Sequence, residues 1–267
     1  MFSLIVMRLL RIIGFATLSV FGYLGELLFL VLETVRSVLK TPIRGRLTLL
    51  QVLEVGARSQ MVVIVTGAFT GMVFAAQTYF QFHKLSMDTA VGAVVSVSMF
   101  RELGPVLSGL MVAGRVGAAM SAEIGTMKVT EQIDALRSLG VHPVDYLVVP
   151  RLIAMVVSMP LLVAECVKIG IVAGQFVAVK LMGVAEVYYI NYMERFTTGR
   201  DLTMALIKGG VFGIIIVFVA CNEGLKAQEG AVGVGRATTE AVVKGSLLIL
   251  IVNFFLTMLL NIFFPAG

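Results

Sequence analysis

Two long stretches of this sequence contain no charged residue, and they restrict the fold more than any other feature. They run from Ser59 to Phe82 and from Gly245 to Phe264. A helix rises 1.5 Å per residue, so about twenty apolar residues cross the roughly 30 Å hydrocarbon core of a bilayer. Only 14% of the chain is charged, whereas soluble proteins carry about 25%. The sequence therefore predicts an all-α integral membrane protein.

Three further apolar stretches are interrupted by isolated charges, and we interpret each as a membrane span. An ionised side chain in the middle of a bilayer costs about 2.5 to 3.5 kcal/mol unless it faces water, protein or a charged ligand. Together with the two charge-free stretches, these give five predicted spans. The interrupted stretches are 89–114 with Arg101 and Glu102, 152–179 with Glu165 and Lys168, and 202–221 with Lys208.

The first forty residues are predicted to form an amphipathic helix in the membrane interface, so that residues 1–45 form an N-terminal region and 46–267 the transmembrane domain. A helix with one polar stripe lies in the interface plane. A sixth span over residues 12–32 remains an alternative, whereas a cleaved signal peptide lacks its small-residue cleavage site. The stripe consists of Arg8, Arg11, Ser19, Gly22, Glu26, Glu33, Arg36 or Ser37, and Lys40.

Lysine and arginine are distributed unevenly around the five predicted spans. Fourteen lie in the N-terminal region and the second and fourth connections, and three lie in the other connections. The positive-inside rule then predicts a cytoplasmic N-terminus and an external C-terminus. The net charge of +5 follows from this topology, and nothing in the sequence indicates nucleic-acid binding.

A compact polar segment, residues 121–140, connects the second and third spans. We expect a short helix from Glu131 to Leu139, with Thr130 as its N-cap and Gly140 as its left-handed end. Val129, Ile133 and Leu136 would form one apolar stripe, which is typical of a helix that presses into a groove on a partner. An ordinary capped helix lying on its own protein is the alternative.

The charges inside the spans point either to a polar cavity or to buried pairs. Arg101 and Glu102 precede Gly104-Pro105, a helix break that we expect to widen the spacing between helices and permit a cavity. Pairing with other charges explains these two residues and Lys208 equally well. Glu165 and Lys168 are three residues apart on one helix, so we expect them to neutralise each other.

The sequence lacks the usual motifs for chemistry. It contains no GxxxxGK[ST] phosphate loop and no nucleophile elbow, so we predict no catalytic residue and no bound cofactor. His83 and His142 have no metal-ligand spacing, and no metal site is predicted. Cys166 and Cys221 lie in apolar spans and are expected to be inert thiols. Small residues four apart, such as Gly67 and Gly71 or Gly170 and Gly174, predict close helix contacts.

Three runs of residues carry a specific resemblance to a known family. They are Arg101-Glu-Leu-Gly-Pro-Val-Leu with the continuation from Val112 through Leu136, the run Tyr146-Leu-Val-Val-Pro-Arg151, and Glu229-Gly-Ala-Val-Gly-Val-Gly-Arg-Ala-Thr-Thr-Glu-Ala-Val-Val243. Together they resemble the MlaE/YrbE permeases, and the resemblance covers essentially the whole chain. The segment Val184 to Arg200 is less diagnostic.

The resemblance implies a subunit of an ABC transporter that moves phospholipids between the inner and outer membranes of Gram-negative bacteria. It implies a homodimer with two cytoplasmic ATPase subunits, a hexameric periplasmic ring of MCE subunits, and often a STAS-domain protein. ATP and Mg²⁺ would bind the ATPase only. The segment from Glu123 to Gly140 would be the coupling helix. Its expected coupling residues are Glu123, Thr130, Glu131, Gln132, Ile133, Asp134, Leu136 and Arg137.

The resemblance also places a lipid cavity near Arg101, Glu102 and Lys208. A guanidinium binds a phosphate head in a fork, and apolar side chains would hold the acyl chains. We therefore expect an inner-membrane permease that extrudes lipid when the ATPases close. The alternatives are an ion-coupled secondary transporter or channel that acts without an ATPase, and a lipid-modifying membrane enzyme. The expected acyl-chain surface is Met72, Phe74, Leu107 and Met111.

Overall fold

The computed structural model describes residues 2–40 and 44–263, although the side chains of residues 2–13, 16, 19 and 20 are outside the description. Five of its helical stretches are long and apolar enough to cross a membrane. They agree with the five predicted spans but extend beyond them, because the helices continue past the apolar stretches. Their bounds are Gly45–His83, Asp88–Val129, Pro143–Leu181, Gly199–Leu225 and Gly230–Phe263.

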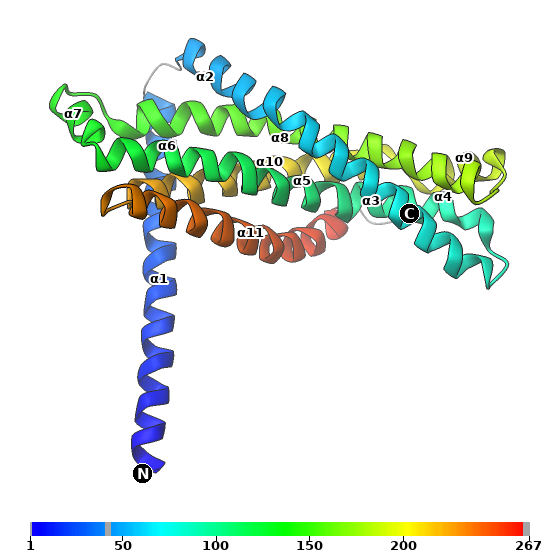
Figure 1. Cartoon of the computed structure of the whole chain (residues 1–267), viewed down its shortest axis with the longest axis horizontal. Coiled ribbons are helices and arrows are strands. Elements are labelled where there is room, and N and C mark those ends of the chain that lie inside the picture. Colours follow the sequence, from blue (N-terminus) through cyan, green and yellow to red (C-terminus); the bar gives the residue numbers. More distant parts are fainter. Residues whose placement is uncertain (1, 41–43, 264–267) are drawn as a thin grey trace.

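The five stretches lie side by side as a bundle, with connections at its two ends (Figure 1). One end carries the short helix α7 (Gln132–Ser138), and the opposite end carries α9 (Glu186–Phe196). The remaining elements, in chain order, are α2 (Gly45–Val52), η1 (Leu53–Ala57), α3 (Arg58–His83), η2 (Asp88–Ala90), α4 (Val91–Ser98), η3 (Met99–Leu103), α5 (Gly104–Val112), η4 (Ala113–Gly117), α6 (Ala118–Val129), α8 (Pro143–Phe176), η5 (Val177–Leu181), α10 (Gly199–Leu225) and α11 (Gly230–Phe263).

The helices α3 and α8 approach each other through glycine. A β-carbon added to Gly71 would lie 2.0 Å from the carbonyl oxygen of Gly170, and one added to Gly67 would lie 2.6 Å from that of Cys166. The absence of side chains therefore lets the two backbones touch. The predicted small-residue contacts are present here within a single subunit.

Within residues 2–40 and 44–263, four π-helical turns interrupt the long helices, and η3 and η4 both fall in the second span. Such turns are rare and occur most often at functional sites. The turn η3 contains Arg101 and Glu102, and η4 contains Arg115, which donates to the Ser59 hydroxyl at 2.7 Å. The second span is thus irregular at the positions that carry its charges.

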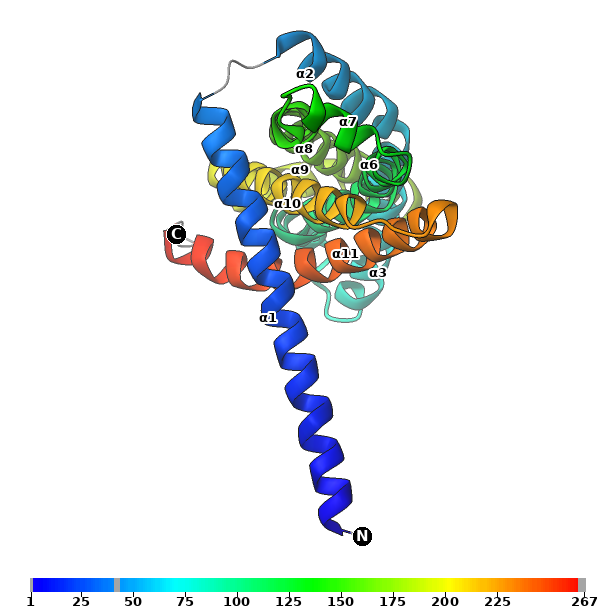
Figure 2. The ribbon, with the colours of Figure 1, turned by 90° about the vertical axis from the view of Figure 1, so that its left-hand side faces the viewer.

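Helix α1 (Phe2–Lys40) lies across the bundle near the end that carries α7 (Figures 1 and 2). Its buried stripe of Leu30, Thr34 and Ser37 faces the bundle. Apolar residues that include Phe15, Phe21, Leu28 and Phe29 are exposed along α1. The predicted polar stripe lies on the bundle side at Glu26, Glu33 and Ser37, because each of these bonds to Lys226, His142 or Asp145. The side chains of Arg8, Arg11 and Ser19 fall outside the description, as does Phe264.

Candidate functional site

The π-helical turn η3 directs Arg101 and Glu102 toward different partners. Successive helical residues point about 100° apart, so neighbours on one turn reach different partners. The Arg101 Nε atom donates to Asp201 Oδ1 at 2.7 Å, near the start of α10. Asp201 is almost fully buried and also closes a capping box with Thr198. The Arg101 guanidinium is therefore held by the Asp201 carboxylate, whose own position is fixed by the capping box.

Lys208 is fully buried, and it donates three hydrogen bonds. Its Nζ atom lies 2.5 Å from the Arg101 carbonyl oxygen, 3.0 Å from Glu102 Oε1 and 2.8 Å from Thr257 Oγ1. An ammonium group has three donors, so this environment satisfies all of them. The ion pair with Glu102 offsets part of the cost of removing the charge from water.

Glu102 also bonds to α11, so its carboxylate joins three segments of the chain. Asn253 Nδ2 donates to Glu102 Oε2 at 2.9 Å, and Thr257 Oγ1 donates to Glu102 Oε1 at 3.0 Å. We name Arg101, Glu102, Asp201, Lys208, Asn253 and Thr257 the charge cluster. It connects η3, α10 and α11 through side chains that the sequence places far apart.

Sequence reasoning found Arg101, Glu102 and Lys208 but missed Asp201, Asn253 and Thr257. A signal for the last two was present, because residues four apart share one helix face and polar residues inside a span require partners. Asp201 was hidden because it stands at the beginning of its span, where a carboxylate looks like an ordinary helix start.

Gly104 contradicts the expectation that the Gly104-Pro105 break widens the spacing between helices. A β-carbon at Gly104 would lie 2.3 Å from the Val167 side chain. The glycine therefore permits a tight contact with α8. The irregularity at this position is the π-helical turn η3, which precedes Gly104.

The expected acyl-chain residues do not share one surface. Met72 and Phe74 are two residues apart on α3, so their side chains point about 160° apart, to nearly opposite sides of the helix. Phe74 packs against the buried core of the bundle. Leu107 and Met111 are four residues apart on one face, and Met111 is exposed.

The expected neutralisation of Glu165 by Lys168 is not seen. Among the ion pairs within 4 Å in residues 2–40 and 44–263, none joins these two side chains. Lys168 is exposed on the surface of α8, and Glu165 is half-buried. A long lysine stem in this position can extend toward the headgroup region.

The short helix α7 exists nearly where it was predicted, but Thr130 does not cap it. Thr130 is the C-cap residue of α6, and its hydroxyl donates to the Thr126 carbonyl oxygen at 2.8 Å. The chain turns instead at Glu131, which adopts φ 61°. Only two residues separate α6 from α7, which leaves no extended residue for a side-chain cap. Gly140 ends the segment with φ 73°, as predicted.

The apolar stripe of α7 faces its own subunit. Ile133 is fully buried and Leu136 is half-buried, since the helix packs against α6 and α8. The outward face presents polar groups, and Asp134 pairs with Lys128 at 3.3 Å and with Arg137 at 3.2 Å. Ile133, which was expected to insert into a partner, is thus turned toward the bundle, whereas Leu136 stays partly accessible. The outward side chains are Glu131, Gln132, Asp134, Ala135, Arg137, Ser138 and Leu139.

Glu123 joins α6 to α8, behind α7. Arg151, which is almost fully buried, donates from Nη2 to Glu123 Oε2 at 2.8 Å and from Nη1 to the Leu147 carbonyl oxygen at 2.7 Å. A buried guanidinium that bonds two helices resists their separation. Glu123 was expected to contact a partner; its carboxylate bonds to Arg151 and ties α6 to α8, while its side chain stays 53% exposed.

No set of three or more histidine, cysteine, aspartate or glutamate side chains is arranged for a metal ion among the residues described here. Cys166 and Cys221 are buried free thiols. The geometry is that of a polar cluster within a bundle and a short helix at one end.

Comparison with known proteins assigns the chain to a family. The family model "Permease MlaE" matches residues 48–259. The chain belongs to the MlaE permease family. A probable ABC transporter permease of Rickettsia bellii is 42% identical over 245 residues, covering 92% of this chain and 95% of that protein.

Two other relatives of this MlaE-family permease have more specific names. The intermembrane phospholipid transport system permease protein MlaE of Haemophilus influenzae is 36% identical over 85% of this chain and 87% of its own length. The chloroplastic protein TRIGALACTOSYLDIACYLGLYCEROL 1 of Arabidopsis thaliana is 37% identical over 84% of this chain and 64% of its own length. The matched region includes the charge cluster and α7, whereas α1 precedes it.

Proposed function

We propose that this permease forms the lipid passage of an ABC transporter that moves phospholipids between the inner and outer membranes, driven by a separate ATPase. The observation that carries this proposal is the separation of two polar features in a chain of this family. The helix α7 lies at one end of the bundle, and the charge cluster lies toward the other end of α10. A site for receiving force and a site for cargo would be linked by continuous helices.

The connection between the second and third spans has the properties of a lever. Helix α7 is joined to α6 by two residues, and its Ile133 is anchored in the bundle. The Arg151–Glu123 bond at 2.8 Å ties α6 to α8. An ATPase that pushes the outward polar face of α7 would therefore tilt α6 and α8 together.

The charge cluster leaves one cation accessible for a phosphate group. Arg101 uses its Nε atom for Asp201, and its side chain remains 28% exposed. Within the described part of the chain, neither terminal nitrogen of Arg101 donates a hydrogen bond. A guanidinium held at Nε still presents a fork that suits phosphate. Arg101 is thus the residue we assign to the lipid head, while Lys208 supports the cluster from inside.

The proposed topology places α7 and the N-terminus in the cytoplasm and the C-terminus in the periplasm of the inner membrane. The excess of lysine and arginine near the α7 end supports it. The position of α1 across the bundle and its exposed apolar side support an interfacial location. The proposal includes a second copy of the chain, an MCE-protein ring, and a STAS-domain protein as partners.

A pair of outward substitutions on α7 tests ATPase coupling. We expect Ala135→Glu with Leu139→Glu to abolish retention of the transporter's ATPase and ATP-driven transfer of a fluorescent phospholipid in proteoliposomes. Both residues are exposed, so the bundle should still fold. Leu181→Glu is the control, because it changes another well-exposed leucine at the opposite end.

Retention of both ATPase and lipid transfer in the double variant would show that α7 is not the coupling element. Lipid transfer driven by an ion gradient, in vesicles that contain this chain alone, would instead favour a secondary transporter.

A further inference from the structure

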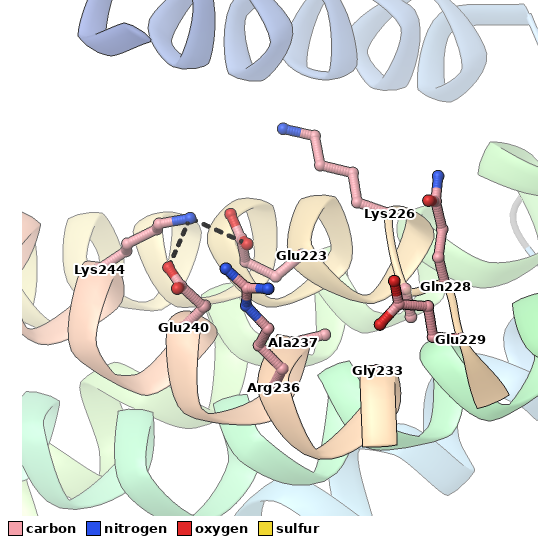
Figure 3. A pocket seen from close by; sticks show the side chains of 10 residues that line it. Glu223, Lys226, Gln228, Glu229, Gly233, Arg236, Ala237, Glu240 and Lys244 are labelled. Atoms are coloured by element: carbon pink, nitrogen blue, oxygen red, sulfur yellow. Dashed lines mark hydrogen bonds and ion pairs between the residues drawn. The ribbon is translucent and has the colours of Figure 1, made fainter. Parts of the chain in front are cut away.

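Two adjoining cavities lie where α1 passes the junction of α10 and α11. The first has a volume of about 300 Å³ and is lined mainly by charged side chains (Figure 3). The second has a volume of about 540 Å³ and is lined largely by apolar residues of α1 and α11. Lys226 and Lys244 line both cavities. A polar chamber joined to an apolar one matches the shape of an amphiphile.

The polar cavity contains equal numbers of positive and negative groups. Its cations are Lys226, Arg236 and Lys244, and its carboxylates are Glu223, Glu229 and Glu240. Lys244 pairs with Glu223 at 3.0 Å and with Glu240 at 2.9 Å, and Lys226 pairs with Glu26 of α1. Such a balance suits a ligand head that carries charges of both signs.

Arg236 and Glu229 are the cavity's charges without an ion pair. No contact within 4 Å between Arg236 and a carboxylate occurs in the described part of the chain, and the same holds for Glu229 with a cation. Arg236 projects from α11 into the cavity, and Glu229 stands at the turn before α11 (Figure 3). Both side chains are exposed, and they are therefore open to a phosphate at Arg236 and an ammonium at Glu229.

Three polar side chains lie together beside this cavity. Asn222 and Glu223 are each 6% exposed. The Tyr23 hydroxyl interacts with both of them, and burial together with the Glu223 carboxylate raises the pKa of Tyr23. Glu223 lines the charged cavity and Tyr23 the apolar one, so this group of side chains marks the boundary between the two.

The apolar cavity adjoins the polar one at Lys226 and Lys244, which line both. The ammonium groups of Lys244 and Lys226 lie 4.8 and 5.2 Å from the centre of the Tyr23 ring. Leu247, Leu248 and Ile251 continue the cavity wall along α11. A hydrocarbon chain placed here would extend away from the charged chamber along the helix.

We propose that these joined cavities bind one phospholipid with a zwitterionic head at the α7 end of the bundle. Its phosphate lies at Arg236 and Lys244, its amine at Glu229, and one acyl chain along Leu247, Leu248 and Ile251.

This site is separate from the charge cluster. Lys226 and Lys208 are 18 residues apart on the α10 axis, which corresponds to about 27 Å. The lipid would fill the space between α1 and α11, so binding would hold α1 against the bundle. The proposal concerns binding alone, and it does not depend on the ATPase or on the direction of transport.

Tryptophan fluorescence offers a direct test, because the chain contains no tryptophan. Leu247→Trp or Ile251→Trp in the full chain, purified in detergent, places one reporter in the apolar cavity. Phosphatidylethanolamine with brominated acyl chains should quench this reporter saturably. A reporter at Leu161→Trp, on the exposed side of α8, should show only weak quenching that rises without saturation.

The head contacts are tested by a charge variant. In the Leu247→Trp background we expect Arg236→Gln to raise the half-saturating lipid concentration about fivefold or more, because a charge-assisted contact is lost. Arg195→Gln, an exposed arginine on α9, should leave it unchanged. Glycerophosphoethanolamine, which has the head without chains, should compete weakly or not at all.

Equal quenching at positions 161 and 247 would overturn the proposal, as would an Arg236→Gln curve identical to that of Arg195→Gln. Full competition by glycerophosphoethanolamine would show a site for a free phosphate compound, which would also refute a lipid site.

Discussion

Lys208 shows how a single residue can be buried as an ion inside a membrane span. Its three donors meet the Arg101 carbonyl oxygen, Glu102 and Thr257, so neither the charge nor the hydrogens are left unpaired. The cost of such an arrangement appears only when one partner is removed, because the remaining charge then stays buried alone.

We expect Glu102→Gln to lower the stability of the purified protein, by up to the 3 to 5 kcal/mol typical of a broken buried pair. The loss should be smaller than this limit because Glu102 is 40% exposed. Adding Lys208→Met should recover part of it, since the uncompensated charge is removed. Thermal unfolding in detergent measures both effects.

Glu194→Gln is the control for this pair, since it changes an exposed carboxylate on α9. A double variant no more stable than Glu102→Gln alone would contradict the assignment of a coupled pair.

At the scale of secondary-structure elements, the contact between α3 and α8 depends on glycine. The carbonyl of Gly170 occupies the position that a side chain at Gly71 would need. Backbone atoms cannot rotate away as a flexible side chain can, so the two helices must move apart to admit a methyl group.

Gly71→Ala should therefore reduce the yield of folded protein and lower its unfolding temperature, with a cost of about 1 to 3 kcal/mol or more. Size-exclusion profiles and thermal unfolding would report it. Gly114→Ala is a matched change in the second span, where an added β-carbon meets nothing within 4 Å. Equal behaviour of the two variants would be inconsistent with the close contact.

For the molecule as a whole, the position of α1 depends on four polar residues, which we name the clasp: Glu33, Ser37, His142 and Asp145. Glu33 lies 3.1 Å from His142 Nε2, and Ser37 donates to Asp145, which also lies 3.6 Å from His142 Nδ1. His142 stands between α7 and α8. The clasp therefore links α1 to the segment that carries α7, and a movement of α7 would reach α1.

We expect Glu33→Gln with Ser37→Ala to loosen α1 without unfolding the bundle. Exposed ion pairs contribute about 0 to 1 kcal/mol and a hydrogen bond about 1 kcal/mol, so amide exchange around residues 30–40 should rise roughly tenfold. Hydrogen–deuterium exchange would measure this against unchanged α8 amides. Arg36→Gln, on the same turn, should have no effect, and an α1 that exchanges equally in all variants would argue against the clasp.

The sequence by itself determined the five spans, the existence of a short helix near residue 133, and the need of the charges at Arg101, Glu102 and Lys208 for partners inside the bundle. These depend on local properties, namely apolar length, turn-forming residues and the cost of charge in hydrocarbon. Family membership, which rests on the sequence alone, gave the class of protein.

Only the tertiary structure decided which residues meet. Asp201, Asn253 and Thr257 complete the charge cluster across separate helices, and Ile133 turns inward because α7 folds back onto α8. The polar stripe of α1 likewise finds its partners on the bundle. Periodicity shows that a helix has two faces, but which face is covered depends on the neighbours, whose positions are fixed by packing between segments distant in the sequence.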